Sequence, residues 1–179
     1  MLMSLRYVPI ADQGDDIQKT QALFESAFPE EERPPFSMML SWNHETFFGV
    51  YEGVDYVGLA DLIVHQDLVY VFFLAIEEDC RGKGFGTRIL SDLKQRYPNR
   101  RLFLLAEETG EEYPDNALRE RRLRFYARNG FFPTGDVVTE FGVRYFLLCA
   151  GDPVSKEEFV DVMRSLIGEE NARRFYSNV

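Results

Sequence analysis

Residues 69–91 of this chain read VYVFFLAIEEDCRGKGFGTRILS, an apolar run followed directly by a glycine-rich turn and an amphipathic segment. The run 69–76 is uniformly apolar, which predicts a central β-strand that is covered on both faces. Beyond the turn, apolar side chains recur at every fourth position, a spacing that predicts a helix with one buried face; they are Phe85, Ile89, Leu93 and Tyr97. A strand that passes through a short turn into such a helix predicts an α/β fold.

The turn is suited to hold an anion. Gly82, Gly84 and Gly86 can adopt positive φ and carry no Cβ, so the main chain can approach a ligand closely. The first N–H groups of the following helix have no partner within the helix, and the helix dipole adds partial positive charge there. Together with Arg81 and Lys83, these donors predict a site for a pyrophosphate. The alternative is a plain linker between a strand and a helix, flanked by two solvated basic residues.

Two common phosphate-binding loops do not match this turn. A Walker loop requires Gly-Lys-Ser or Gly-Lys-Thr, and neither tripeptide occurs in the chain. A dinucleotide fingerprint requires the spacing G-x-G-x-x-G, normally within the first βα unit. Here the spacing is G-x-G-x-G and the loop lies in mid-chain, so neither motif accounts for it.

The hexapeptide Arg81-Gly82-Lys83-Gly84-Phe85-Gly86 resembles the R/Q-x-x-G-x-G/A signature of the GNAT family of N-acetyltransferases. A second signature follows in the expected order and spacing, a helix that ends in Tyr126 and then the pair Gly130-Phe131. The resemblance covers roughly residues 3–150. It implies a mixed, mostly antiparallel central sheet that is splayed at the acetyl-CoA site and flanked by helices. It also implies an enzyme of the acyltransferase class. This enzyme would be an N-acetyltransferase that moves the acetyl group of acetyl-CoA to a primary amine by direct transfer.

The resemblance assigns the co-substrate to particular residues. Main-chain groups near Leu74, Ala75 and Ile76 would bind the pantetheine arm, and a free N–H there would polarise the thioester carbonyl. The pyrophosphate would lie on the turn and the start of the helix, on Arg81, Gly82, Lys83, Gly84, Phe85, Gly86 and Thr87. Tyr126 takes the place of the family's tyrosine and is the expected general acid for the departing thiolate.

The acceptor amine needs residues that bind it and remove its proton. A protonated amine is not a nucleophile, so a carboxylate must accept a proton from it directly or through water. Glu107 ends the predicted strand 102–106 and is the candidate base, ahead of Glu108. The loop that covers the acceptor site in this family would place three residues at the acceptor, namely Glu31, Glu32 and Arg33. For all of these acids, the alternative is a solvated loop without a role in catalysis.

Two other classes of function stay open. A non-catalytic acyl-CoA-binding or sensory module could use the same scaffold, because a fold does not determine a function. A nucleotide-phosphate binder could use the same turn.

The sequence departs from the family's pattern at one position: where many members carry an asparagine on the tyrosine-bearing helix, this sequence has Arg119.

Net charge and cysteine content limit the partners and the cellular compartment that we expect for this protein. The formal net charge of -10 argues against nucleic-acid binding and mildly favours a cationic acceptor, either a small-molecule or a peptide amine. Cys80 and Cys149 make no disulfide framework, and no Cys/His cluster suggests a metal. No apolar run approaches the roughly 18 residues of a membrane span. We therefore expect a cytoplasmic protein that uses acetyl-CoA as co-substrate and needs no metal, nucleic acid or membrane.

Hydrophobic periodicity and turn residues predict the remaining elements. Further strands are expected at 5–10, 47–51, 56–64, 102–106, 131–133 and 137–150, with a bend near Gly135 and another near Gly142. Further helices are expected at 15–28, 36–43, 116–129 and 155–166 or longer, with a charged, proline-bearing loop at 29–35. Residues 1–150 would form the acetyltransferase-like domain. Residues 151–179 would form a helical extension packed on the same domain, or alternatively across a homodimer.

Overall fold

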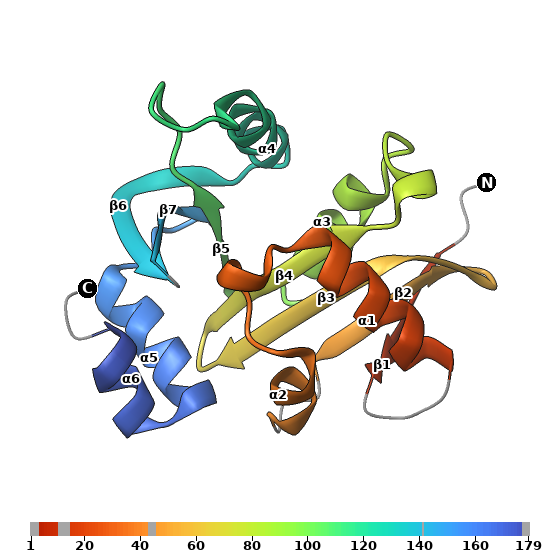
Figure 1. Ribbon diagram of the computed structural model, residues 1–179, viewed down its shortest axis with the longest axis horizontal. Coiled ribbons are helices and arrows are strands. Elements are labelled where there is room, and N and C mark those ends of the chain that lie inside the picture. The colour runs from red at the N-terminus through yellow and green to blue at the C-terminus, as the bar shows by residue number, and fades with distance from the viewer. Residues whose placement is uncertain (1–3, 11–14, 43–45, 141, 177–179) are drawn as a thin grey trace. The chain divides into compact units, whose positions relative to one another are not determined.

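The computed structural model describes residues 4–10, 15–42, 46–140 and 142–176 (Figure 1). Seven strands form one sheet in the order β1-β2-β3-β4-β5-β7-β6, with the bounds β1 (Leu5–Pro9), β2 (Phe47–Glu52), β3 (Asp55–His65), β4 (Leu68–Ile76), β5 (Arg101–Glu107), β6 (Phe132–Glu140) and β7 (Val143–Ala150). β4 and β5 run parallel, whereas β1–β2, β2–β3, β5–β7 and β6–β7 are antiparallel pairs. The expected mixed, mostly antiparallel sheet is therefore confirmed.

The helices flank this sheet. They are α1 (Asp15–Ala27), α2 (Phe36–Ser41), α3 (Phe85–Arg96), α4 (Asn116–Arg128), α5 (Lys156–Ile167) and α6 (Glu169–Tyr176), with two short 3₁₀ turns, η2 (Glu30–Glu32) and η3 (Glu78–Cys80). Within the described ranges, none of the helices combines the length and the apolar character that crossing a membrane would require.

The chain divides into two compact units. Unit 1 comprises Met1–Ile63 and Val71–Arg96, and unit 2 comprises Val64–Tyr70 and Tyr97–Val179. The division falls inside β4, whose first residues pair in parallel with the start of β5 within unit 2. The proposed division of the chain at residue 150 stays a prediction.

Aromatic side chains build the core of unit 1. Phe24 of α1 packs against Phe47 of β2 and Phe73 of β4, with ring centroids 6.4 and 4.9 Å apart. The next residue of β2, Phe48, points to the opposite face because successive side chains of a strand alternate. There the guanidinium of Arg96 in α3 lies 5.8 Å from its ring centroid. α1 and α3 therefore cover opposite faces of the strands of unit 1, and Figure 1 looks onto the α1 side.

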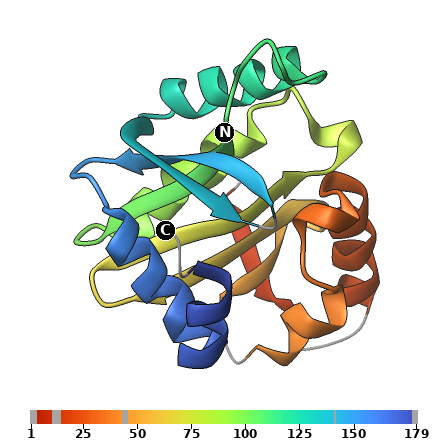
Figure 2. The same ribbon diagram turned by 60° about the vertical axis from the view of Figure 1, so that its left-hand side comes forward.

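A second aromatic cluster builds the core of unit 2. Tyr70 stacks on Phe103 with ring centroids 4.7 Å apart and an interplanar angle of 5°. Phe159 of α5 meets both rings edge-on, at 5.8 and 6.4 Å, and Tyr176 of α6 meets Phe159 at 5.4 Å. The two C-terminal helices lie side by side in Figure 2. Their apolar faces thus pack on the first residues of β4 and β5.

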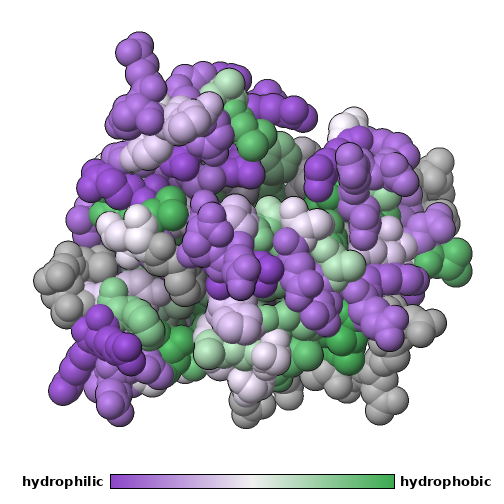
Figure 3. Space-filling model, in the orientation of Figure 1, coloured by the Kyte–Doolittle hydropathy of each residue, from purple (hydrophilic) through white to green (hydrophobic). Residues whose placement is uncertain are grey.

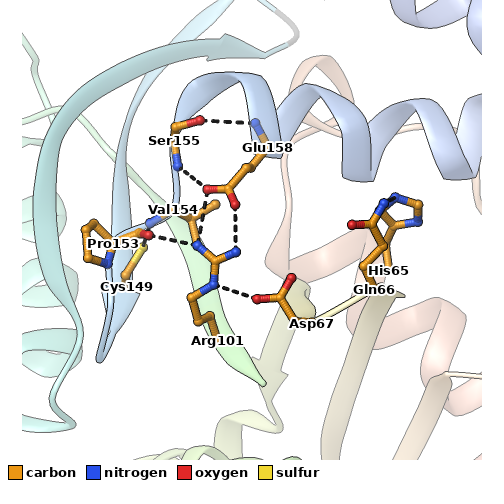
Figure 4. Close-up of polar contacts among 9 residues, drawn as sticks. All are labelled: His65, Gln66, Asp67, Arg101, Cys149, Pro153, Val154, Ser155 and Glu158. Carbon is orange, nitrogen blue, oxygen red and sulfur yellow. Dashed lines mark hydrogen bonds and ion pairs between the residues drawn. The ribbon is translucent and has the colours of Figure 1, made fainter. Parts of the chain in front are cut away.

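Arg101, the first residue of β5, fastens the start of α5 (Figure 4). Its guanidinium donates to Asp67 Oδ2 at 2.8 Å and to Glu158 Oε1 at 2.6 Å. Glu158 also closes a capping box, because its N–H donates to Ser155 Oγ at 3.3 Å and its carboxylate accepts from the Ser155 N–H at 2.9 Å. Hydrogen bonding from Arg101 lowers the pKa of Glu158. One arginine therefore joins the turn before β4, the strand β5 and the helix α5.

Most predicted elements agree with the structure to within two residues, and two differ in an informative way. The break expected near Gly135 is a register shift inside a continuous β6, where Gly135 has φ of +99°. The terminal helix is followed by a second helix, α6, which the sequence did not predict. Gly168 separates them with φ of +82°, a left-handed conformation that ends α5.

Candidate active site

The glycine-rich turn lies in unit 1, between η3 and the first residue of α3. Gly82 and Gly84 have φ of +74° and +85°, and a Cβ added to either one would meet no atom within 4 Å. Glycine is therefore needed at these two positions because the backbone is left-handed there, and not because a larger side chain would clash. Phe85 is buried at the start of α3, which fixes the turn against the core of unit 1.

Main-chain N–H groups along the turn are available to bind a ligand. The N–H of Arg81 donates to Glu78 O at 3.1 Å, and the N–H of Arg88 donates to Gly84 O at 3.0 Å. Between these two, the N–H groups from Gly82 to Thr87 donate no hydrogen bond to the part of the chain that the structure describes. The side chains of Arg81 and Lys83 are exposed beside them. Free N–H donors at a helix N-terminus, together with two cations, fit a diphosphate.

The turn is tied to the end of β4. Arg81 Nε donates to the carbonyl oxygen of Ile76 at 3.1 Å. The Glu77 N–H donates to Val57 O of β3 at 3.0 Å, so β4 is anchored just beyond its last residue. The residues predicted to bind pantetheine lie at this end of β4, where Ala75 is buried and its neighbours are half-buried: Leu74, Ala75 and Ile76.

The predicted acceptor loop forms the short turn η2 and not an irregular segment. Glu31 is exposed and Glu32 is half-buried. Arg33 is held at the end of α1, because its Nε donates to Phe28 O at 2.9 Å and its guanidinium lies 5.4 Å from the ring centroid of Phe24. Arg33 therefore fixes the loop, and of the two acids predicted to lie at the acceptor Glu31 is the exposed one.

Tyr126 lies in unit 2, in the last turn of α4. Gly130 has φ of +76° and its N–H donates to Ala127 O at 2.9 Å, while the Phe131 N–H donates to Tyr126 O at 3.0 Å. These two bonds form a Schellman motif. The predicted role of Gly130 as the cap of this helix is confirmed, and the motif fixes the main chain of Tyr126.

The hydroxyl of Tyr126 is in a desolvated environment. Burial raises the pKa of Tyr126 to about 12, the cation of Arg122 lowers it, and the carboxylate of Glu107 raises it. The phenol therefore keeps its proton at neutral pH, as a general acid must.

Glu107, the candidate base, is ion-paired with Arg122 of α4. Sequence reasoning missed Arg122. The signal that could have found it is the spacing of four residues to Tyr126, which places both side chains on one face of the helix.

The neighbouring acid Glu108 is engaged elsewhere. It accepts hydrogen bonds from Arg144 Nε at 2.6 Å and from the Tyr113 hydroxyl at 2.9 Å, and these bonds lower its pKa. Arg119, which replaces the family's asparagine, donates to Asp115 Oδ1 at 2.8 Å and to Glu108 O at 3.1 Å. Arg119 thus holds the loop between β5 and α4.

No group of three or more His, Cys, Asp or Glu side chains is placed to hold a metal ion, as far as the described residues go.

A model of the acetyltransferase (GNAT) family matches residues 17–131 of the chain. Among curated proteins, YjbC of Bacillus subtilis (strain 168), which is ascribed to the acetyltransferases, is 35% identical over 66 residues. This match covers 37% of the present chain and 32% of YjbC, so it spans about a third of that relative's length.

Solved structures show the same fold. A protein from Bacteroides thetaiotaomicron ascribed to the GNAT family superposes with a TM-score of 0.71 at 18% identity, covering 91% of this chain and 95% of its own. An aminoglycoside 6'-N-acetyltransferase complexed with coenzyme A gives 0.63 at 15% identity, covering 86% and 100%. Arabidopsis thaliana Naa50, in complex with the bisubstrate analogue CoA-Ac-MVNAL, gives 0.59 at 17% identity, covering 85% and 100%.

The fold class expected from the sequence is confirmed by these structures, and the expected family is confirmed by the match over most of the chain. The chain therefore belongs to the acetyltransferase (GNAT) family.

Proposed function

We propose that this protein transfers the acetyl group of acetyl-CoA directly to a primary amine. The observation that carries the proposal is the run of free main-chain N–H groups from Gly82 to Thr87, flanked by exposed Arg81 and Lys83. A helix N-terminus with free donors and cations suits a diphosphate, which coenzyme A carries. Family membership and the coenzyme A in the similar aminoglycoside acetyltransferase support the same co-substrate.

Acetyl-CoA supplies an activated acyl group in the form of a thioester. In the transfer, the amine nitrogen forms a bond to the carbonyl carbon while the bond between that carbon and sulfur breaks. A protonated amine gives up one proton before the attack and a second as the amide forms, while the sulfur gains one, so the products are an N-acetylated amine, the free thiol and one proton released to solvent. We assign acceptance of the amine proton to Glu107 and protonation of the sulfur to Tyr126. Tyr126 is then reprotonated from solvent, and Glu107 returns its proton there.

Main-chain groups of unit 1, which also contains the glycine-rich turn, would bind the rest of the co-substrate. We propose that Leu74, Ala75 and Ile76 bind the pantetheine arm at the end of β4, where Arg81 already contacts the Ile76 carbonyl. We assign the amine acceptor to the η2 loop, in which Arg33 fixes the main chain and the carboxylates of Glu31 and Glu32 would attract a cation. The acceptor is a small-molecule or peptide amine, since one similar enzyme is named for an aminoglycoside and another binds a peptide analogue.

We place this reaction in a reducing, cytoplasmic setting, because both Cys80 and Cys149 are free thiols. Assembly as a homodimer, in which residues 151–179 would take part, stays a prediction.

The test combines binding and turnover on the full chain. Acetyl-CoA at a hundred times its Kd stabilises a protein that binds it by about 2.7 kcal/mol, which should raise the melting temperature by roughly 5–10 °C. Release of free thiol is then followed with a panel of aminoglycosides, amino acids, small amines and a lysine-containing peptide. Thermal stabilisation with amine-dependent thiol release is the expected result, and no stabilisation by acetyl-CoA contradicts the proposal.

Two other outcomes identify the alternative functions. Stabilisation without thiol release for every acceptor would indicate a non-catalytic acyl-CoA-binding module. Competition by ATP or NAD at affinities comparable to that of acetyl-CoA would indicate a nucleotide-phosphate binder.

A further inference from the structure

We infer that Arg122 is a positioning residue that couples proton acceptance by Glu107 to proton donation by Tyr126. The inference rests on the proposed function, because it gives the two flanking residues their catalytic roles. All three side chains belong to unit 2, and they come from the end of β5 and from α4.

The geometry singles out Arg122 among the arginines of α4. Arg119 and Arg124 form their ion pairs along the helix, with Asp115 and Glu120 respectively. Arg122 instead reaches another element and pairs with Glu107, the last residue of β5. Figure 3 shows hydrophilic side chains over much of the visible surface of the protein, and a charge that faces water needs no partner in the sheet.

The pair is partly shielded from water. The Glu107 side chain is 11% exposed, whereas Arg122 is 41% exposed. A carboxylate with so little access to solvent depends on its partner for stabilisation of its charge. The ion pair with Arg122 therefore holds the Glu107 carboxylate in one position.

Tyr126 follows Arg122 by one helical turn, and its hydroxyl is sensitive to both members of the pair. The cation of Arg122 lowers the pKa of Tyr126 and the carboxylate of Glu107 raises it, so the two charges oppose each other while the pair is intact. When Glu107 takes up the amine proton, its negative charge disappears and the Arg122 cation is no longer compensated. The phenol of Tyr126 then becomes a stronger acid at the stage when the thiolate must be protonated.

The test uses the full chain with acetyl-CoA and the amine that gives the fastest thiol release in the panel above. We expect Arg122→Gln to lower kcat roughly 10- to 100-fold, because it leaves the Glu107 carboxylate without its α4 partner near the Tyr126 phenol. KM for acetyl-CoA should stay within about threefold, since the substitution is outside the diphosphate-binding turn. The acidic limb of the kcat–pH profile should move to higher pH, because a neighbouring cation has been removed.

Three further single variants and one double variant separate coupling from a purely structural role. Arg122→Lys keeps the cation and should restore the position of the acidic limb. Arg124→Gln removes a charge from the same helix and should leave both kcat and the profile unchanged. Glu107→Gln should abolish most turnover, and adding Arg122→Gln to it should cause no further loss, because the coupling acts through Glu107.

The outcomes distinguish this inference from the proposed function. If the wild-type chain releases no thiol with any amine, the proposed function is wrong and the inference is overturned with it. If the wild type turns over and Arg122→Gln has the kcat and pH profile of Arg124→Gln, the inference alone is overturned. A lower kcat with an unmoved acidic limb would mean that Arg122 only supports the fold.

Discussion

The main-chain carbonyl of Ala75 occupies the space that a β-carbon on Gly58 would fill. Gly58 lies in β3 and Ala75 near the end of β4, both within unit 1, and the Cα of Ile76 is 3.3 Å from the same position. A Cβ stands out of the plane of a sheet, so a carbonyl at this point is turned out of the regular ladder. β4 is therefore distorted at the residues that we propose bind pantetheine, and Gly58 permits the distortion.

Replacement of Gly58 by alanine should destabilise the protein. The added methyl group meets main chain, which cannot rotate away, so we expect a loss of about 1–3 kcal/mol and a fall in melting temperature of roughly 3 °C for each kcal/mol. Acetyl-CoA should also stabilise the variant less than it does the wild type. Thermal melts with and without acetyl-CoA measure both effects.

Gly49→Ala is the matched control in the neighbouring strand. The nearest atoms to its added Cβ belong to the side chains of Tyr56 and Tyr51, at 3.2 and 3.3 Å, and side chains can move by a few tenths of an ångström. A response of Gly58→Ala to acetyl-CoA equal to that of Gly49→Ala would show that the β4 distortion is irrelevant to binding.

Gly84→Ala should weaken acetyl-CoA binding with little other effect. Gly84 has φ of +85° in open space, so the substitution strains the backbone without a clash. A strain of about 1–2 kcal/mol would shift the turn and should reduce the affinity for acetyl-CoA by roughly tenfold. Isothermal titration measures the change.

The control for local strain is Gly168→Ala, since Gly168 has φ of +82° and equally open space between α5 and α6. It should lose a similar amount of stability and keep its affinity for acetyl-CoA. Equal affinities for the Gly84 and Gly168 variants would refute the proposed role of the turn.

The parts of the fold that could be predicted from the sequence depend on local signals. The apolar run of β4, the stripe of α3 and the cap at Gly130 are each specified by residues within a few positions of one another. The same holds for the turn that we propose binds the diphosphate, because its glycines and the helix start are contiguous.

The parts that could not be predicted depend on partners far apart in the chain. Glu107 and Arg122 are separated by 15 residues. The spacing of four residues to Tyr126 places Arg122 on the tyrosine's face of α4, but it does not indicate that the side chain reaches β5. Arg101 pairs with Asp67 and Glu158, which lie 34 and 57 residues away in the chain. These partners come together only when α5 packs on the strands. Such pairings follow from tertiary structure, which periodicity does not encode.

Tyr126→Phe should abolish most turnover while leaving the co-substrate bound. General acid catalysis contributes about 10²- to 10⁴-fold, so kcat should fall by that factor, with an unchanged affinity for acetyl-CoA. In the wild type, the pKa of about 12 keeps the phenol protonated, so its ionisation should produce no fall in kcat below about pH 10.

Tyr113→Phe is the matched control, because it removes the same hydroxyl from a residue outside the proposed proton transfers, one whose hydroxyl donates to Glu108. It should keep turnover within about twofold of the wild type. Undiminished turnover in Tyr126→Phe would remove Tyr126 from the mechanism.

Glu140, the last residue of β6, should make the stability of the protein depend on pH. It is only 7% exposed, and its carboxylate accepts a hydrogen bond from the Tyr176 hydroxyl at 2.6 Å. Burial raises the pKa of Glu140 to about 7. The folded chain therefore binds more protons than the unfolded chain between about pH 4.5 and pH 7, so this group stabilises the fold at low pH and the contribution is lost as the pH rises through 7.

Replacing Glu140 by glutamine should remove this dependence while keeping an acceptor for Tyr176. Relative to the wild type, Glu140→Gln should gain stability as the pH rises from 5 to 8, by about 3 kcal/mol at most. The other carboxylates titrate equally in both proteins, so their contribution cancels in the difference between the two free energies of unfolding. Glu111→Gln, an exposed site in the same unit, should show a constant difference. Parallel melting curves for Glu140→Gln and wild type across this pH range would mean that the carboxylate is solvated, and that α6 is not held over a buried acid.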